Sequence, residues 1–281
     1  MSLIFLVRIR QNSAGALALM LLFLTSSLAW AGMTPSEVND FKRDKIDAEK
    51  GDVKSQYNLA QCYYHGWGVE KDYAQAVNWY RKAAMEGFSG AQYNLGTCYY
   101  FGEGTPKDAK LAVHWFKKAA QQGDAWAMNN LGQCYFLGDG TDTDYGQAVY
   151  WYRKAAEEGL AEAQVNLAQC YTKRAGVAYD PSQIFYWFER AAEQGNPIAL
   201  CNLGNCYFYG VGVTKDETEA YAYYKVSEND SELGARNAAM TEKELPIHMI
   251  IAGKKRAKEI KQKIEVTIAA KKEIAAKKAG K

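Results

Sequence analysis

Cysteine is the residue type in this sequence with the clearest capacity for chemistry, and its spacing is regular. Five of the six cysteines stand 36 residues apart, namely Cys62, Cys98, Cys134, Cys170 and Cys206. Thiols can form disulfides, bind zinc or act as nucleophiles. No C-x-x-C pair occurs, and the three histidines, His65, His114 and His248, are scattered along the chain. A zinc site is therefore not expected, and we expect no cofactor.

The 36-residue step also argues against disulfides between neighbouring members of the series. Equivalent positions on adjacent helices lie about one interhelical spacing apart, 8–10 Å, whereas a disulfide needs its Cα atoms within about 7 Å. We therefore predict small buried thiols, most of them reduced. The sixth cysteine, Cys201, occupies the position that holds Tyr57, Tyr93, Asn129 and Val165 in the other units. It is predicted to lie nearer the surface.

The same step runs through other residue types, which identifies the elements that must position the thiols. It relates Leu59, Leu95, Leu131, Leu167 and Leu203; Asp72, Asp108, Asp144, Asp180 and Asp216; and Trp79, Trp115, Trp151 and Trp187, with Tyr223 in the fifth place. A fixed period of 20–50 residues is typical of a solenoid, in which each unit buries its apolar face against its neighbours. Five registers without an insertion predict such a fold here.

Each unit is predicted to form two helices. In the second unit, Ala91, Leu95, Cys98 and Tyr99 form one buried stripe at helical spacing, and Ala112, Trp115, Phe116 and Ala119 form another. Gly102 and Gly104 end the first helix because glycine tolerates positive φ. Glycine at 96, 132 and 204 suggests that a neighbouring helix lies close. In the fourth unit Arg174 replaces the first loop glycine, so we expect a distorted loop there.

The motif "AQYNLGTCYYFGEG" followed by "WFKKAAQQG" resembles the Sel-one-like repeat (SLR), a relative of the tetratricopeptide repeat. The resemblance covers residues 51–230, as five 36-residue units. It implies an all-α fold, a right-handed superhelical solenoid of αα-hairpin repeats with terminal capping helices, in which the first helix of each pair lines the concave face. It also implies a non-catalytic scaffold that binds a protein or peptide partner.

Cysteine-rich exported members of this family suggest an alternative, penicillin binding and β-lactam hydrolysis. Those relatives carry a K-A-C motif at the end of the second helix, with a second cysteine about eight residues later. Here the same places read "KAAMEGFSGAQ" and "KAAQQGDAWAM". The bridging cysteines are missing, and neither a nucleophile elbow nor an S-x-x-K motif occurs. The sequence therefore favours the scaffold over the enzyme.

The N-terminus predicts export. Residues 1–31 combine Arg8 and Arg10, an apolar core of about eleven residues and the small-x-small site Ala29-Trp30-Ala31, as a secretory signal peptide does. An uncleaved N-terminal anchor is the alternative, but the apolar run is short for a membrane span. We expect a periplasmic or extracellular bacterial protein. Residues 32–50 are predicted to form a helix that caps the first repeat.

The C-terminus, residues 231–281, is predicted to form a capping helix and a basic helical tail. Residues 242–281 hold twelve Lys or Arg against five Asp or Glu, whereas residues 32–241 hold twenty against twenty-seven. The tail is either solvated or in contact with an acidic partner, a lipid headgroup surface or the acidic solenoid itself. Nucleic acid is not expected, because the tail has no aromatic residues for stacking on bases. We expect a monomer.

In tetratricopeptide-like hairpins, first-helix residues beside the buried stripe face the groove. Amides suit the backbone of an extended peptide, and aromatic side chains give large contact areas. The candidate peptide-binding residues are Tyr57, Gln61, Tyr64, Tyr93, Asn94, Thr97, Tyr100, Asn129, Asn130, Gln133, Phe136, Asn166 and Gln169. Two alternatives remain open: the asparagines at 58, 94, 130, 166 and 202 bond the neighbouring hairpin, and the aromatic residues pack in the core.

Overall fold

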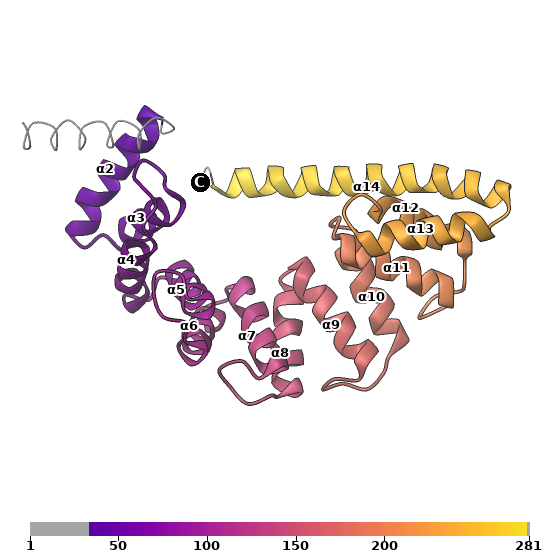
Figure 1. The fold of residues 1–281 in the computed structure, drawn as a ribbon, viewed down its shortest axis with the longest axis horizontal. Coiled ribbons are helices and arrows are strands. Elements are labelled where there is room, and N and C mark those ends of the chain that lie inside the picture. The colour runs from indigo at the N-terminus through magenta and orange to yellow at the C-terminus, as the bar shows by residue number, and fades with distance from the viewer. Residues whose placement is uncertain (1–33, 280–281) are drawn as a thin grey trace, which may run out of the picture. The chain divides into compact units, whose positions relative to one another are not determined.

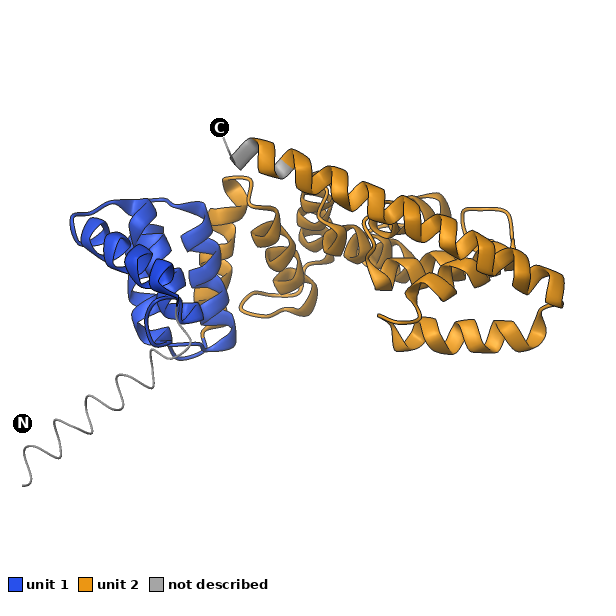
Figure 2. Ribbon diagram, turned by 90° about the horizontal axis from the view of Figure 1, so that it is seen from above, with its two compact units in different colours: residues 1–107 blue, residues 108–281 orange. Residues whose placement is uncertain are grey.

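The computed structural model describes residues 34–279, so the predicted signal peptide lies outside the described residues. The chain divides into two compact units, residues 1–107 and 108–281 (Figure 2). The helices of unit 1 are α2 (Pro35–Glu49), α3 (Val53–His65), α4 (Tyr73–Met85) and α5 (Ser89–Phe101) (Figure 1). Those of unit 2 are α6 (Ala109–Gln121), α7 (Ala125–Leu137), α8 (Tyr145–Glu157), α9 (Ala161–Lys173), α10 (Pro181–Ala192), α11 (Pro197–Tyr209), α12 (Glu217–Ser227), α13 (Glu232–Glu244) and α14 (Ile247–Ala279).

Within each unit, consecutive helices pack against each other as repeated hairpins. The pairs α3–α4, α7–α8, α9–α10 and α11–α12 are the hairpins of single repeats, and α4–α5, α6–α7, α8–α9 and α10–α11 join one repeat to the next. The short loops require neighbouring helices to run antiparallel. The predicted all-α class and the repeated hairpin are confirmed.

The aspartate series marks the start of each second helix. Asp72, Asp108, Asp144, Asp180 and Asp216 are the N-caps of α4, α6, α8, α10 and α12, and each side chain accepts a backbone N–H from the first turn. Such a cap satisfies a donor that the helix itself cannot, and replacing it by alanine costs about 1 kcal/mol. The aspartates are thus explained by helix initiation.

The loop between the two helices carries two residues with positive φ. The first is a helix C-cap, as at Gly66, Gly102, Gly138 and Gly210. The second packs on the previous repeat: a Cβ at Gly104 would overlap with the carbonyl of Tyr73, and one at Gly140 with that of Ala109. The predicted distortion at Arg174 is wrong. Arg174 takes the left-handed conformation of the glycines (φ 59°), so the loop keeps its form.

One aromatic position forms the centre of each repeat. Tyr80, Phe116, Tyr152, Phe188 and Tyr224 are all buried, as are the leucines of the 36-residue series. The buried placement predicted for Trp115 is wrong, because Trp115 is only half-buried. Phe116 points into the core, and the preceding residue on an α-helix lies about 100° away around the axis. The ammonium group of Lys118 lies 4.7 Å from the centre of the Trp115 ring.

The terminal helices continue the repeat register. Residues 37–49 of α2 stand 36 positions before α4, and α2 packs on α3 as a second helix packs on the next repeat. At the other end α13 takes the place of a sixth first helix. Its Asn237 lies 36 residues after Cys201 and contacts the Sγ atom at 3.7 Å. The prediction that Cys201 lies nearer the surface is therefore wrong, since α13 covers it and leaves it 1% exposed.

The basic tail folds back within unit 2. Helix α14 lies beside α12 (Figure 1) and buries Ile250, Gly253, Ala257, Ile260 and Ile264 along one face. A Cβ at Gly253 would lie 2.6 Å from Cδ1 of Tyr221, so glycine permits the close approach. Farther along, Ile264 and Ile268 cover Gly195, in the turn after α10.

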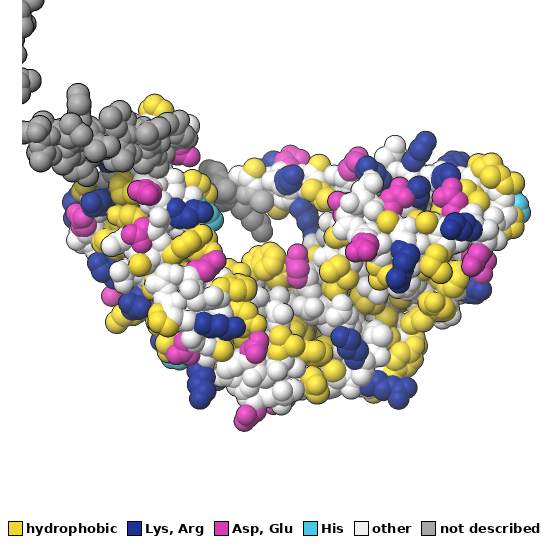
Figure 3. Space-filling view, in the orientation of Figure 1, with side chains coloured by type: hydrophobic (Ala, Val, Ile, Leu, Met, Phe, Trp, Pro, Cys, Tyr) yellow, Lys and Arg dark blue, Asp and Glu magenta, His cyan; other side chains and the backbone are white. Residues whose placement is uncertain are grey.

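Charge complementarity accompanies this packing. The ion pairs are Lys254–Glu242 at 2.6 Å, Arg256–Glu219 at 2.7 Å and Lys263–Glu193 at 3.0 Å, and Lys271 donates to the amide oxygen of Gln194 at 2.6 Å. Figure 3 shows basic and acidic side chains interspersed over this end of unit 2. Of the alternatives left open for the tail, contact with the acidic solenoid is the one that the structure shows.

Candidate peptide-binding surface

A recess recurs beside the first helices at the 36-residue step. In unit 2, the neutral recess between α7, α8 and α9 encloses about 160 Å³ and is lined by Gln133, Phe136, Leu137, Tyr152, Asn166 and Gln169. One repeat later, the apolar recess encloses about 220 Å³ and is lined by Thr172, Tyr179, Ile184, Phe188, Asn202, Asn205, Cys206, Tyr209 and Val211. Asn166 and Asn202 occupy equivalent positions, as do Tyr152 and Phe188.

Unit 1 has its own version of this recess, which we call the acidic recess. It encloses about 500 Å³ and is lined by Glu37, Asp40, Arg43, Asp44, Tyr57, Asn58, Gln61, Cys62, His65 and Trp67. Asn58, Gln61 and Cys62 are equivalent to Asn202, Asn205 and Cys206 of the apolar recess. Tyr57 and Gln61 are candidates from the sequence, whereas the contribution of α2 was not foreseen.

Glycine on the first helix lets the two helices of a repeat approach closely. A Cβ at Gly132 would lie 2.8 Å from Cδ1 of Tyr152, and one at Gly204 would lie 2.5 Å from Cε1 of Tyr224. The ring of the second helix therefore occupies the space that a larger residue on the first helix would fill. The close helix approach predicted from the glycine slot is confirmed at these two positions.

Tyrosine hydroxyls on the second helices orient the recess amides. Tyr80 donates to Oε1 of Gln61 at 3.0 Å, and Nε2 of Gln61 donates to the Tyr57 hydroxyl at 2.6 Å. In the fifth repeat Tyr224 donates to Oδ1 of Asn205 at 2.8 Å. A side chain held in one orientation loses less entropy when a ligand binds, so these amides are preorganised.

Other candidates in unit 1 make contacts within the unit. Tyr64 is half-buried and donates to Oε2 of Glu103 at 2.6 Å. The hydroxyl of Thr97 donates to the Tyr93 carbonyl, one turn earlier on the same helix. Tyr93, Asn94 and Tyr100 are half-buried on α5. The ammonium group of Lys107 lies 5.6 Å from the centre of the Tyr100 ring.

The candidates in unit 2 differ in accessibility. Asn129 is buried, and its Oδ1 accepts a hydrogen bond from Nδ2 of Asn166 at 2.9 Å, which links α7 to α9. This pair fits the alternative in which asparagines join neighbouring hairpins. Gln133 is exposed, whereas Asn130, Phe136 and Gln169 are half-buried. The structure therefore brings Gln133, Phe136, Asn166 and Gln169 together in one recess and places Asn129 in the packing beneath them.

The thiols are poorly suited to nucleophilic chemistry. All six cysteines are free and buried. Burial raises the pKa of Cys98, Cys134 and Cys206 to about 12, and that of Cys62 and Cys170 to about 11. Burial also raises the pKa of Cys201. Because the thiolate is the reactive form, these groups are almost entirely protonated and inert at neutral pH.

Within residues 34–279, no group of three or more His, Cys, Asp or Glu side chains is arranged to hold a metal ion. No helix in the same range is both long enough and apolar enough to cross a membrane.

Comparison with known proteins gives the family. Residues 53–88, 89–124, 127–160, 161–196 and 197–227 each match the Sel1 repeat model. A search of curated proteins found no match. A solved Sel1 repeat protein from Oxalobacter formigenes is 34% identical, with a TM-score of 0.65, and the alignment covers 69% of this chain and 80% of that one.

A second solved structure is c5321, a protective antigen present in uropathogenic Escherichia coli strains that displays an SLR fold. It is 31% identical, with a TM-score of 0.65, over 84% of this chain. The chain spans 59% of the length of c5321. Five consecutive repeat matches and two relatives of this similarity show that the chain belongs to the Sel1 repeat family.

Proposed function

We propose that the protein is an exported, non-catalytic scaffold whose first helices bind an extended peptide segment of a protein partner. The recurrence of one recess at the 36-residue step carries this proposal. The neutral recess offers the amides of Gln133, Asn166 and Gln169 beside the Phe136 ring. The apolar recess offers Asn202 and Asn205 beside aromatic and aliphatic side chains. Amides pair with a peptide backbone, and apolar surfaces contribute contact area.

The order of the recesses suggests the form of the peptide. The neutral and apolar recesses lie one repeat apart on successive first helices. We therefore expect an extended peptide that places a hydrogen-bonding side chain in the neutral recess and, farther along, an apolar side chain in the apolar recess.

Partner capture tests the proposal. The protein from Gly32 onward would be immobilised and exposed to an envelope extract of the source bacterium. The affinity of a captured partner would then be measured for the double variant Gln133→Ala/Gln169→Ala. The matched control is Gln121→Ala/Gln147→Ala, which removes two exposed glutamines outside the recesses. We expect the first variant to bind at least about tenfold more weakly and the control to bind normally. Unchanged binding by a correctly folded first variant would contradict the assignment of the binding surface.

Export rests on the sequence of residues 1–31 and has its own test. Sequencing the N-terminus of the protein recovered from the periplasm or the medium should give Gly32 as the first residue. Retention of residues 1–31 would instead favour an uncleaved anchor.

A further inference from the structure

One residue breaks the aromatic series at the centre of the repeats. Counting back 36 residues from Tyr80 gives Asp44, on α2. The equivalent positions in the five repeats hold Tyr80, Phe116, Tyr152, Phe188 and Tyr224, all buried. Asp44 is buried as well, with 8% of its surface exposed. A carboxylate thus stands where every repeat has a ring, and the space of the missing ring is part of the acidic recess.

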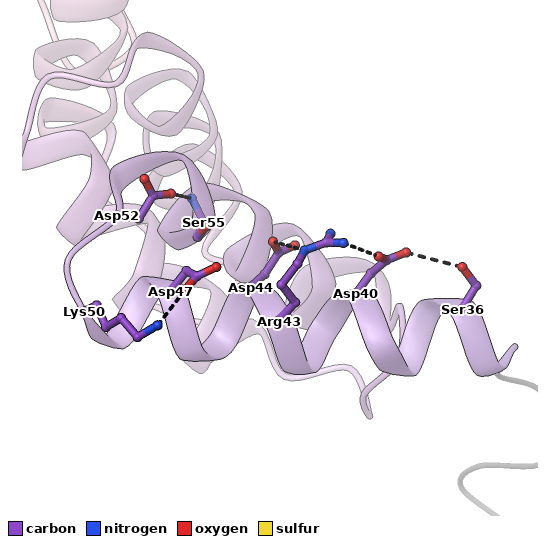
Figure 4. Close-up of polar contacts among 8 residues, drawn as sticks. All are labelled: Ser36, Asp40, Arg43, Asp44, Asp47, Lys50, Asp52 and Ser55. Carbon is purple, nitrogen blue, oxygen red and sulfur yellow. Dashed lines mark hydrogen bonds and ion pairs between the residues drawn. The ribbon is translucent and has the colours of Figure 1, made fainter.

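The charges around Asp44 are unbalanced. Three carboxylates, those of Glu37, Asp40 and Asp44, line the acidic recess with one guanidinium, that of Arg43. Figure 4 shows Arg43 between Asp40 and Asp44 on α2. Its Nη1 lies 3.0 Å from Asp40, but its Nε lies 3.8 Å from Asp44, and its side chain is 63% exposed. An exposed ion pair of this kind contributes little to stability.

Asp44 is therefore a buried carboxylate with incomplete compensation. Burial raises its pKa, because the ionised form loses hydration, and the neighbouring carboxylates of Asp40 and Asp47 act in the same direction. Together they outweigh the opposing effects of Arg43 and of a hydrogen bond from the Asn58 side chain. Stability alone would favour an aromatic residue at this position, as in the five repeats. A second cation brought close to Asp44 would offset the lost hydration.

Two aromatic residues of the recess lining suit a planar cation. The rings of His65 and Trp67 stack with centroids 4.4 Å apart and an interplanar angle of 21°. Trp67 is 49% exposed, so the indole is accessible to a ligand. Guanidinium groups stack on aromatic faces and pair with two carboxylate oxygens at once, which an ammonium group cannot do.

We propose that the acidic recess binds one arginine side chain of a peptide, with its guanidinium between Asp44, Asp40 and the Trp67 indole. This inference rests on the proposed function and adds a residue type to what unit 1 recognises. The neutral and apolar recesses of unit 2 have no charged lining residues, whereas the acidic recess has three carboxylates, so a cation is expected in unit 1.

The test uses short probes and the NMR signal of the Trp67 indole N–H in the ¹⁵N-labelled full mature chain, assigned by Trp67→Phe. The probes are the capped pentapeptide Ala-Ala-Arg-Ala-Ala and its citrulline analogue, which keeps the shape and removes the charge. We expect a saturable shift with the arginine peptide and binding at least about tenfold weaker with the citrulline peptide. Equal binding of the two peptides, or no shift with either, would overturn the proposal.

Three variants separate recognition from folding. Asp44→Asn should weaken binding of the arginine peptide about tenfold, and Glu49→Gln, which removes an exposed carboxylate from the same helix, should not. Arg43→Gln should strengthen binding, because it removes the resident competitor. If Asp44 had only a structural role, Asp44→Asn and Arg43→Gln would not change peptide binding in opposite directions. Normal binding by Asp44→Asn would overturn the proposal.

Two outcomes distinguish this inference from other readings. A concentration-dependent shift of the Trp67 signal without peptide, abolished by deleting residues 265–281, would show that the basic tail of a second copy fills the recess and would overturn the proposal. If the Gln133→Ala/Gln169→Ala variant loses its partner while the arginine peptide fails to bind, only the present inference falls and the proposed function stands.

Discussion

Two adjacent aromatic residues of α6 make unequal contributions to the core. Phe116 is 1% exposed, whereas Trp115 is half-buried. Removing a fully buried ring loses transfer free energy and leaves a cavity, so Phe116→Ala should lower the free energy of unfolding by about 3–5 kcal/mol. Trp115→Ala should cost less, because part of its ring already contacts water. Urea denaturation followed by circular dichroism measures both, with Leu111→Ala as an exposed control on the same helix. A larger loss for Trp115→Ala would contradict the structure.

Thiol reactivity should depend on folding. The raised pKa values leave little thiolate at pH 8, and five of the six side chains are at most 3% exposed. Cys62 is 7% exposed and lines the acidic recess, so it should be the first to react. We expect iodoacetamide to add no more than one group in native buffer and six in denaturant without reductant, as counted by mass spectrometry. Fewer than four groups in denaturant would show that disulfides form.

The buried carboxylate of Asp44 should make stability depend on pH. Its pKa is raised in the folded state, so ionisation costs free energy there that the unfolded chain does not lose. Below the unfolded pKa of about 3.9 both states are protonated and the penalty is absent. This penalty develops as the pH rises through the folded pKa and is complete above it.

Asp44→Asn should therefore have a higher Tm than wild type at pH 7, and the difference should shrink toward pH 4. Glu49→Gln, at an exposed position of the same helix, controls for the loss of one negative charge; an equal gain in that variant would refute the argument.

At the scale of single elements, the loop between the two helices of a repeat requires a residue with positive φ. Arg174 is the one non-glycine residue with positive φ in residues 34–279. The left-handed conformation costs a side-chain-bearing residue about 1–2 kcal/mol. Arg174→Gly should therefore raise the free energy of unfolding by about 1 kcal/mol, although the added freedom of the unfolded chain offsets part of the gain. Lys173→Gly, one residue earlier inside α9, should instead destabilise. Thermal denaturation of the two variants would show whether their effects have opposite signs.

The helices differ in how far their placement could be predicted. The hairpins followed from the repeat itself, because the leucine, aspartate and glycine positions recur at one spacing. Periodicity could not show which of Trp115 and Phe116 points into the core, since both are aromatic and they are adjacent in the sequence. It also could not place α14 beside α12, because the tail has no repeat partner and its contacts join residues far apart, such as Arg256 and Glu219. Asp44 was missed because the register was not extended back into α2. Of the candidate site, the neutral recess was largely foreseen and the acidic recess was not.

For the whole molecule, a solenoid should respond locally to a local change, because each repeat contacts only its neighbours. A substitution on helix α14 can test this local response. Ile260 is buried on α14 and lines the small hollow between α14, α10 and α12, together with Glu189 and Tyr223. Ile260→Ala should loosen the docking of α14, since removing buried methyl groups leaves a cavity.

Hydrogen exchange measured by mass spectrometry would follow the effect along the chain. We expect Ile260→Ala to speed exchange in α14, α12 and α10, and to leave α3 and α4 of unit 1 unchanged. Lys261→Ala, at an exposed position one residue farther along, is the matched control and should alter neither region. If Ile260→Ala lowered protection equally in α3, α4 and α12, the chain would unfold as one cooperative body. The short-range contacts between successive helices would then be a poor guide to how the protein transmits a perturbation.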